Sequence, residues 1–371
     1  MKKLRPKVRK YAPVLAKMRM VRRLREALKR RERRRAKHPY YADCLHLPAP
    51  THFSVSETRH RKNLLSFLRK LRTRIAVMRK PLRIDFRPTQ RMVSCGTLLF
   101  VAELDRCIRS VAGRVRVSYQ GPRDKIVAQV LQQVGITALL GSKRRQDGDS
   151  FDPTVRHWRF ATGVHADATK FDELLGDFEG RIAPALSQSI FKGVTEAMTN
   201  CAQHAYHEPR RDGTNIRDER RWWMFSEEVE GNLHVAFCDL GMGIPRSLPK
   251  IDESAAPGWM GMLRDFLSSF KPTSQEAAMI KAAIEIGRSR TNQPHRGLGL
   301  NQIVETAKVR PGSRVLIMSN HGAYDLEPAR LMTEQLVQFD DSIMGTLIQW
   351  SMPVQNKDER NGANDGDDPH R

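Results

Sequence analysis

A short, largely apolar strand that ends in an aspartate and two glycines constrains the fold of this chain more than any other feature. Leu233–Cys238 has the composition of a buried strand and leads directly into Asp239-Leu-Gly-Met-Gly. A carboxylate at a strand end can accept a hydrogen bond from an exocyclic amine, and Gly241 and Gly243 let the backbone approach a flat base closely. An ordinary hairpin has the same appearance, so this segment needs support from others.

Polar residues recur at helical spacing upstream of this strand, in the segment 191–206 (FKGVTEAMTNCAQHAY). Glu196, Asn200 and His204 are four apart, so they would share one face of a helix. Mg²⁺ prefers hard oxygen ligands, so the Asn200 amide is the predicted metal ligand. A carboxylate one turn earlier can orient or deprotonate a nucleophile, which makes Glu196 the predicted catalytic residue. The alternative is a helix surface on which these residue types meet by chance.

Glycines precede two further elements. Gly297 and Gly299 lie at the start of a helix in the segment 296–308 (RGLGLNQIVETAK), where backbone N–H groups can point at phosphate oxygens and the helix dipole favours negative charge. Gly345 and Thr346 precede the apolar residues of a closing strand. Each pattern is common, so their order along the chain carries the weight.

In this order the four segments resemble the GHKL ATPase superfamily, which has E-x-x-x-N on a helix, D-x-G-x-G, G-x-G-L at a helix start, and often a Thr near the adenine. The resemblance covers residues 155–353. It implies the GHKL (Bergerat) fold of the α/β class, a two-layer sandwich with a mixed sheet backed by helices, and ATP in a cleft under a mobile lid. The implied roles are adenine acceptor for Asp239, catalytic carboxylate for Glu196, Mg²⁺ ligand for Asn200, and further ATP contacts for Gly241, Gly243, Gly297, Gly299 and Thr346.

The pattern E-A-x-x-N-x-x-x-H-A-Y is most similar to the serine kinases that phosphorylate anti-sigma-factor antagonists. The stretch 245–295 departs from those kinases, because it is longer than their lid and contains a helix-like segment, 274–286. Arg288 and Arg290 either close on the phosphates or are exposed loop charges. His60 is followed by Arg-Lys-Asn and lacks the Glu and nearby Pro of a phosphoacceptor histidine, so histidine autokinase activity is not expected.

Strands and helices alternate between residues 82 and 134, which implies an α/β layer with parallel strands. This segment resembles a STAS domain, the fold of anti-sigma-factor antagonists, in which a serine at a helix start accepts phosphate. Here the matching positions are Val93-Ser94-Cys95-Gly96, so the family's aspartate is missing and one serine is replaced by Cys95. Ser94 either accepts phosphate or belongs to a degenerate domain that docks on the ATPase-like domain or on a partner. The predicted elements are strands at 82–86 and 114–119 and helices at 97–111 and 124–134.

The formal net charge of +23 at pH 7 is local to the N-terminus. Residues 1–80 hold 27 Lys and Arg against 4 acidic residues, whereas the remaining 291 residues hold 37 of each sign. Such an arm attracts a polyanion, because each phosphate neutralised by Lys or Arg releases condensed counterions. Nucleic acid is the first candidate. An anionic membrane surface is another, because apolar residues recur at helical spacing over 14–28, and a solvated or partner-binding helix is the third.

Composition divides the chain into a basic helical arm (1–80), a STAS-like domain (81–142), a linker (143–153), the GHKL domain (154–353) and a disordered tail (354–371). No stretch approaches the roughly 18 to 20 apolar residues of a transmembrane helix, and the N-terminus lacks the apolar core of a signal peptide. Five cysteines without a C-x-x-C pair argue against a disulfide framework and a structural zinc site. We therefore expect a cytoplasmic protein with reduced thiols.

These features predict an ATP- and Mg²⁺-binding regulatory protein, in which γ-phosphate transfer to a protein Ser or Thr is slightly favoured over hydrolysis. A protein partner or phosphoacceptor is expected, and a dimer is compatible with the sequence. A second hypothesis is an ATP-gated nucleic-acid-binding switch that uses the arm. A third is a scaffold whose ATP site is structural, and the intact Glu196 and Asn200 argue against it.

Overall fold

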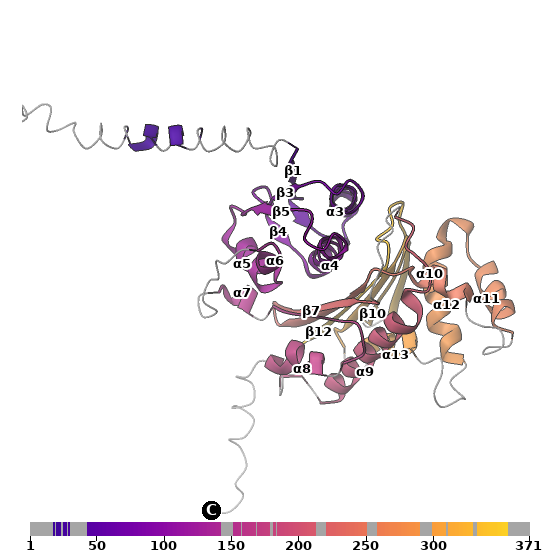
Figure 1. Cartoon of the computed structure of the whole chain (residues 1–371). Helices are drawn as coiled ribbons and strands as arrows, with labels where there is room; N and C mark the ends of the chain where they lie inside the picture. The colour runs from indigo at the N-terminus through magenta and orange to yellow at the C-terminus, as the bar shows by residue number, and fades with distance from the viewer. Residues whose placement is uncertain are drawn as a thin grey trace, which may run out of the picture.

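A helix that is apolar on nearly every side organises this α/β fold. In α4 (Ser94–Ser110) every residue from Ser94 to Leu104 is buried. A helix buried all round must lie between two layers, since a surface helix hides only one stripe. In the computed structural model, α4 indeed lies between a small α/β layer and one face of a large sheet (Figure 1).

The chain is described in several stretches. No helix within them is long and apolar enough to cross a membrane. Besides residues 18, 20–23, 25–27 and 29 of the predicted arm, they comprise 43–141, 151–156, 158–167, 169–178, 181–182, 184–212, 220–250, 258–289, 299–308, 311–328 and 332–354. Most of the predicted arm before residue 43, most of the predicted linker and the predicted tail after Val354 lie outside the described residues.

The small layer has three parallel strands in the order β1-β3-β5, as expected for strands that alternate with helices. A second parallel pair, β2 and β4, leads into the start of α4. The strands are β1 (Leu45–Pro48), β2 (His52–Phe53), β3 (Leu82–Asp85), β4 (Arg91–Met92) and β5 (Val117–Gln120), and the other helices are α3 (Thr58–Arg72), a π turn at Thr73–Val77, α5 (Lys125–Gln133) and α6 (Ile136–Leu139).

The boundary predicted between the arm and this layer is wrong. β1 pairs with β3, and α3 packs against α4, so residues 45–80 belong to the folded layer. The reason is that α3 is amphipathic: its apolar stripe is buried, while basic residues such as Lys62 and Lys70 point to solvent. The basic residues of α3 continue the positive charge of residues 1–42, so charge alone did not separate the helix from the arm. The buried stripe is Leu64, Leu65, Phe67, Leu68 and Leu71.

The large sheet has seven strands, and every pairing found in it is antiparallel, unlike the mixed sheet that the resemblance implies. Short connections account for the pairings β7–β8, β9–β10 and β10–β11, because short turns can join only antiparallel neighbours. In the turn between β7 and β8, Glu230 and Gly231 both have positive φ, at 51° and 72°, as the twist of a two-residue hairpin requires. In sheet order the strands are β11 (Met332–Gln338), β10 (Gly322–Pro328), β9 (Arg314–Ser319), β12 (Thr346–Pro353), β8 (Asn232–Asp239), β7 (Trp222–Val229) and β6 (Arg159–Gly163).

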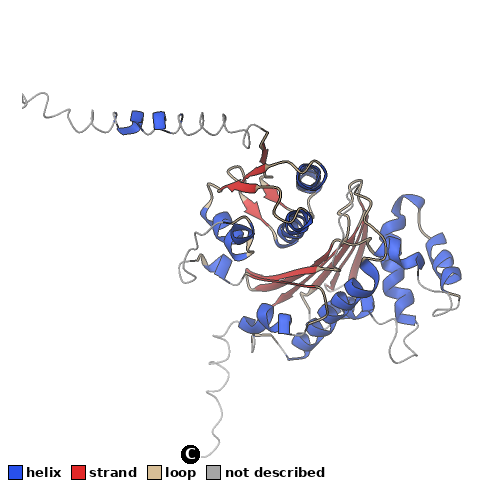
Figure 2. Cartoon of the chain, in the orientation of Figure 1, coloured by secondary structure: helices blue, strands red, loops and turns tan. Residues whose placement is uncertain are grey.

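Both faces of the large sheet are covered, so the arrangement is not a simple two-layer sandwich (Figure 2). Alternate residues of each strand point to opposite faces. In β8, Val235 and Phe237 join the core beneath α9 (Pro184–Asn200) and α13 (Gly299–Lys308), whereas Ala236 and Cys238 join the core shared with the small layer. The continuous apolar runs of these strands follow from this two-sided burial.

The remaining helices lie around the edges of the large sheet. The helix-like segment predicted at 274–286 is α12 (Gln275–Ser289), which packs on β10 and β11. The others are α7 (Pro153–Arg156), α8 (Thr169–Leu175), α10 (Ile244–Ser247), α11 (Trp259–Ser268), a π turn at Cys201–Ala205, and short 3-10 turns at Gly176–Phe178, Leu248–Lys250 and Pro272–Ser274.

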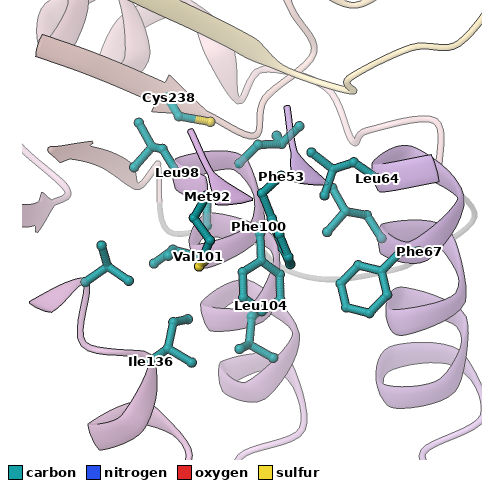
Figure 3. Close-up of a cluster of buried hydrophobic side chains, with 14 of the residues drawn as sticks. Phe53, Leu64, Phe67, Met92, Leu98, Phe100, Val101, Leu104, Ile136 and Cys238 are labelled. Carbon is teal, nitrogen blue, oxygen red and sulfur yellow. The ribbon is translucent and has the colours of Figure 1, made fainter. Parts of the chain in front are cut away.

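The core around α4 joins the two layers (Figure 3). Leu98 lies on the side of α4 toward Cys238 of β8, while Phe100 meets Phe53 and Phe67 within the small layer, with ring centroids 5.1 and 5.8 Å away. The five cysteines are all free, and four of them are buried. The reduced thiols expected from the sequence are therefore part of the packing.

We expect Gly96→Ala to destabilise the protein, because an added Cβ would lie 2.3 Å from the carbonyl oxygen of Phe53. Overpacking of this kind costs about 1–3 kcal/mol of unfolding free energy, measurable by urea denaturation. Gly121→Ala is the matched control, since nothing lies within 4 Å of its added Cβ. Equal stability of the two variants would contradict this packing.

Candidate functional site

Asp239 ends β8 and is 5% exposed. Its Oδ1 accepts a hydrogen bond of 2.9 Å from the Gly241 backbone N–H, and both the hydroxyl and the backbone N–H of Thr346 donate to the carboxylate. Burial raises the pKa of Asp239 to about 6, although these hydrogen bonds and the charge of Arg210 act in the opposite direction. A carboxylate has about four acceptor positions, and three donors are named for this one.

Thr346 is brought to Asp239 by strand register. It opens β12, and its Cα partners in the sheet are Asp239 on one side and Ser319 of β9 on the other. The Ser319 and Thr346 hydroxyl oxygens are 3.2 Å apart, and the Ser319 hydroxyl accepts a hydrogen bond of 2.8 Å from the Ile244 N–H. The predicted Asp239–Thr346 pair is therefore assembled at the ends of three strands.

The glycines of this region serve close packing of the protein itself. A Cβ on Gly241 would lie 2.2 Å from the Ala205 carbonyl oxygen, and one on Gly345 would lie 2.2 Å from that of Asp239. Gly243 has a φ of +80°, and its Cβ would meet the Asn320 amide at 2.5 Å. Side chains are thus excluded at all three positions for reasons independent of any ligand.

Sequence reasoning missed Ser319 and Asn320. The Asn320 side chain donates a hydrogen bond of 2.8 Å to the Met242 carbonyl and accepts one of 3.3 Å from the Gly345 N–H. It thereby ties the loop after β8 to the turn before β12. The available signal was a polar Ser-Asn pair at the end of the apolar strand β9, with Gly322 two residues further on.

Glu196 and Asn200 lie on successive turns at the end of α9, which packs against α13. Both side chains are half-buried, and neither has a hydrogen bond or ion pair with another residue in the described stretches. Burial raises the pKa of Glu196. A carboxyl group and an amide are therefore available at this end of the helix.

A π turn follows Asn200 and changes the spacing predicted for His204. Because π-helical hydrogen bonds run from i to i+5, a four-residue spacing no longer keeps side chains on one face. His204 is exposed, so the structure does not group it with Glu196 and Asn200. The same turn carries Ala205, whose carbonyl accepts a hydrogen bond of 2.7 Å from Met242 in the loop after β8. The end of α9 is thus fixed against that loop.

The predicted phosphate-binding segment is described only in part. Gly297 and Arg290 lie outside the described residues, and the placement of the Arg288 side chain is not described. Gly299 is the first residue of α13, as the sequence predicts. No group of three His, Cys, Asp or Glu side chains within the described part of the chain is arranged to hold a metal ion.

Ser94 starts α4 and is 1% exposed. The Ser94 hydroxyl lies 3.5 Å from Oε1 of Gln349 on β12, and hydrogen bonding from Ser94 to the carboxylate of Glu227 on β7 opposes the burial that raises the pKa of Glu227 to about 7. Glu227 therefore occupies the positive end of α4, the position at which a phosphate would be stabilised. The small layer docks on the large sheet, and Ser94 is buried in this contact.

No protein-family model matches this sequence, and no curated protein matches it significantly.

We expect Asp239→Asn to stabilise the protein at alkaline pH. A pKa raised from 3.8 to about 6 in the folded state means that Asp239 favours folding fully below pH 3.8 and loses this contribution as pH rises through 6. The shift corresponds to about 3 kcal/mol of unfolding free energy at pH 8. Thermal melts from pH 4 to 8 should show the variant gaining stability over the wild type only at higher pH. The exposed Asp265→Asn should show no such trend, and a flat difference for Asp239→Asn would contradict the buried charge.

Proposed function

We propose that residues 154–353 bind ATP with Mg²⁺ in the manner of the GHKL superfamily, and that the protein is a regulatory ATPase or protein serine/threonine kinase. The observation that carries this proposal is the buried Asp239 carboxylate, which lies at the ends of β8, β9 and β12 and has three named donors for about four acceptor positions. No salt bridge to Asp239 occurs in the described part of the chain, so an exocyclic amine is a suitable partner.

The chemistry proposed for the other end of the ligand depends on α9. Glu196 and Asn200 project from adjacent turns without partners among the described residues, and α13 begins at Gly299 beside this helix. Mg²⁺ supplies charge neutralisation on phosphate oxygens when it is bound. Asn200 would hold the ion, and Glu196 would orient a Ser or Thr hydroxyl, or a water, and receive its proton. The raised pKa of Glu196 suits this role.

Calorimetry with ATP and Mg²⁺ tests the site. We expect the wild type to bind in the micromolar range, and Asp239→Asn and Asn200→Ala to lose or sharply weaken binding. Glu196→Gln should keep ATP affinity and lose turnover, because it preserves shape and removes the proton acceptor. Absence of wild-type binding at concentrations far above micromolar would reject the proposal. Labelled γ-phosphate recovered on a protein Ser or Thr would favour the kinase, and free phosphate alone would favour the ATPase.

A second candidate function, nucleic-acid binding, is favoured by the charge of the small layer. Residues 43–141 hold 18 Lys and Arg against 6 acidic residues, so basic character continues from the arm into the folded part. Much of it is exposed, on α3 and at the starts of β3 and β5: Arg59, Lys62, Arg69, Lys70, Lys80, Arg114 and Arg116. A polyanion is the partner that such a surface attracts.

Fluorescence anisotropy with a short labelled DNA or RNA strand tests this second candidate. Deletion of residues 1–42 leaves β1 and the small layer intact, unlike a deletion of 1–80. We expect affinity to fall steeply with salt, and the deletion to weaken binding and flatten the salt dependence. An unchanged salt slope would show that the arm does not contact the strand. Phosphate incorporation into a protein that persists without the arm would favour the kinase function instead.

A further inference from the structure

A cluster of buried charges joins the small layer to the turn before Thr346. Arg210, in the segment after the π turn, has a side chain 2% exposed, and its guanidinium contacts Glu103 of α4 at 2.8 Å and Asp212 at 2.6 Å. Arg72 of α3 also contacts Glu103 at 2.8 Å, and Arg106 of α4 contacts Asp212 at 2.9 Å. Five charged groups therefore meet where the two layers join.

Burying these charges between the two layers has a large desolvation penalty. Removing charges from water costs several kcal/mol per ion, and well-packed apolar residues often stabilise such a contact more. Burial alone would raise the pKa of Glu103, but the arginines around it lower that pKa below its ordinary value. Glu103 is therefore charged and forms ion pairs with Arg210 and Arg72. A charge placed here at such a cost suggests a role in positioning.

Arg210 reaches the proposed adenine end of the site through one residue. Its Nη1 donates a hydrogen bond of 2.9 Å to the Met344 carbonyl oxygen. Met344 has a φ of +57°, and Gly345 after it has a φ of +148° and lies against the Asp239 backbone. Thr346 follows and donates to the Asp239 carboxylate. The hydrogen bond from Arg210 thus fixes a strained turn that places the donor next to Asp239.

The small layer holds the segment before this turn from a second side. Arg61 of α3 donates a hydrogen bond of 3.0 Å to the Asp341 carbonyl oxygen, and its guanidinium lies 3.9 Å from the centroid of the Phe339 ring. Arg72 also approaches the Met344 sulfur at 3.8 Å. Residues 339–345 are consequently supported by α3, which lies outside the large sheet.

We propose that Arg210 is a positioning residue for nucleotide binding and that the small layer controls the affinity of the site through Glu103. This inference rests on the proposed function. Movement of α4 away from the sheet would remove Glu103 from Arg210 and free the turn at Met344. Because coupling is reciprocal, nucleotide bound at Asp239 would tighten the docking of the small layer by the same free energy. The small layer would thus act as an effector within the same chain.

Nucleotide affinity of variants tests the coupling. We expect Glu103→Gln and Arg210→Met to weaken ATP–Mg²⁺ binding by about tenfold, within the usual range of coupling, and Arg210→Lys to restore part of it. Glu227→Gln is the matched control, since it also removes a buried carboxylate between α4 and the sheet but does not contact Arg210. The inference would be overturned if the wild type binds ATP–Mg²⁺ and the Glu103→Gln and Glu227→Gln variants bind it with equal affinity.

A second measurement works without nucleotide and separates the two proposals. Around Asp239 the titratable groups are Arg210, Cys201 and Cys238, and the positive charge of Arg210 lowers the pKa of Asp239. Thermal melts across pH give the stability difference that Asp239→Asn causes, first in the wild-type chain and then in a chain that also carries Arg210→Met. Removal of the Arg210 charge should shift this pH-dependent difference to higher pH. If the wild type fails to bind ATP, the proposed function is rejected. The shift of the stability difference along the pH axis still decides whether the Arg210 charge acts on Asp239. An unchanged profile would reject that action.

If the variants fail to fold, hydrogen exchange on the wild-type chain replaces them. ATP–Mg²⁺ should increase protection in α4 and in residues 339–345, which lie outside the segments proposed to hold the phosphates. Protection confined to α9, α13 and the loop after β8 would overturn the coupling.

Discussion

The packing of α4 between the two layers is the contact on which the rest of the structure depends, because each layer buries apolar surface against it. Leu98 and its neighbours cover Ala236, Cys238 and Leu347 of the large sheet, and Phe100 fills the small layer. Each fully buried side chain of this kind contributes roughly 1.5–3 kcal/mol. Loss of the contact would expose one complete apolar face of the sheet. The two sheets are therefore parts of one cooperative structure.

Polar groups within this contact determine its geometry. Apolar packing alone would allow α4 to slide along the sheet. Glu227 of β7, which faces the start of α4, and Glu103 of α4 itself each require specific hydrogen-bond donors. Their desolvation is compensated by Ser94 in one case and by arginines in the other. The orientation of α4 is thus specified by two carboxylates, and the one near Arg210 also supports the turn before Thr346.

The candidate site carries a cost to stability. Asp239 is charged at neutral pH although it is buried, and Glu196 is half-buried without a partner among the described residues. Such groups lower stability in the free protein and become favourable when a ligand supplies the missing donors.

The sequence by itself determined the local elements and the site residues carried by them. Period and composition were sufficient for β8 with Asp239 at its end, for α9 with Glu196 and Asn200, for α5, and for the start of α13 at Gly299. They were insufficient for β1 and α3, because the basic surface of an amphipathic helix and a solvated basic arm have the same charge.

Only the tertiary structure decided that the sheet is covered on both faces, that Ser94 is buried beside Glu227, and that Arg210 and Ser319 lie close to Asp239 and Thr346. These contacts join residues that are far apart in the sequence. The spacing of residue types along the sequence could not reveal them, because it carries information only about neighbours within one helix or strand.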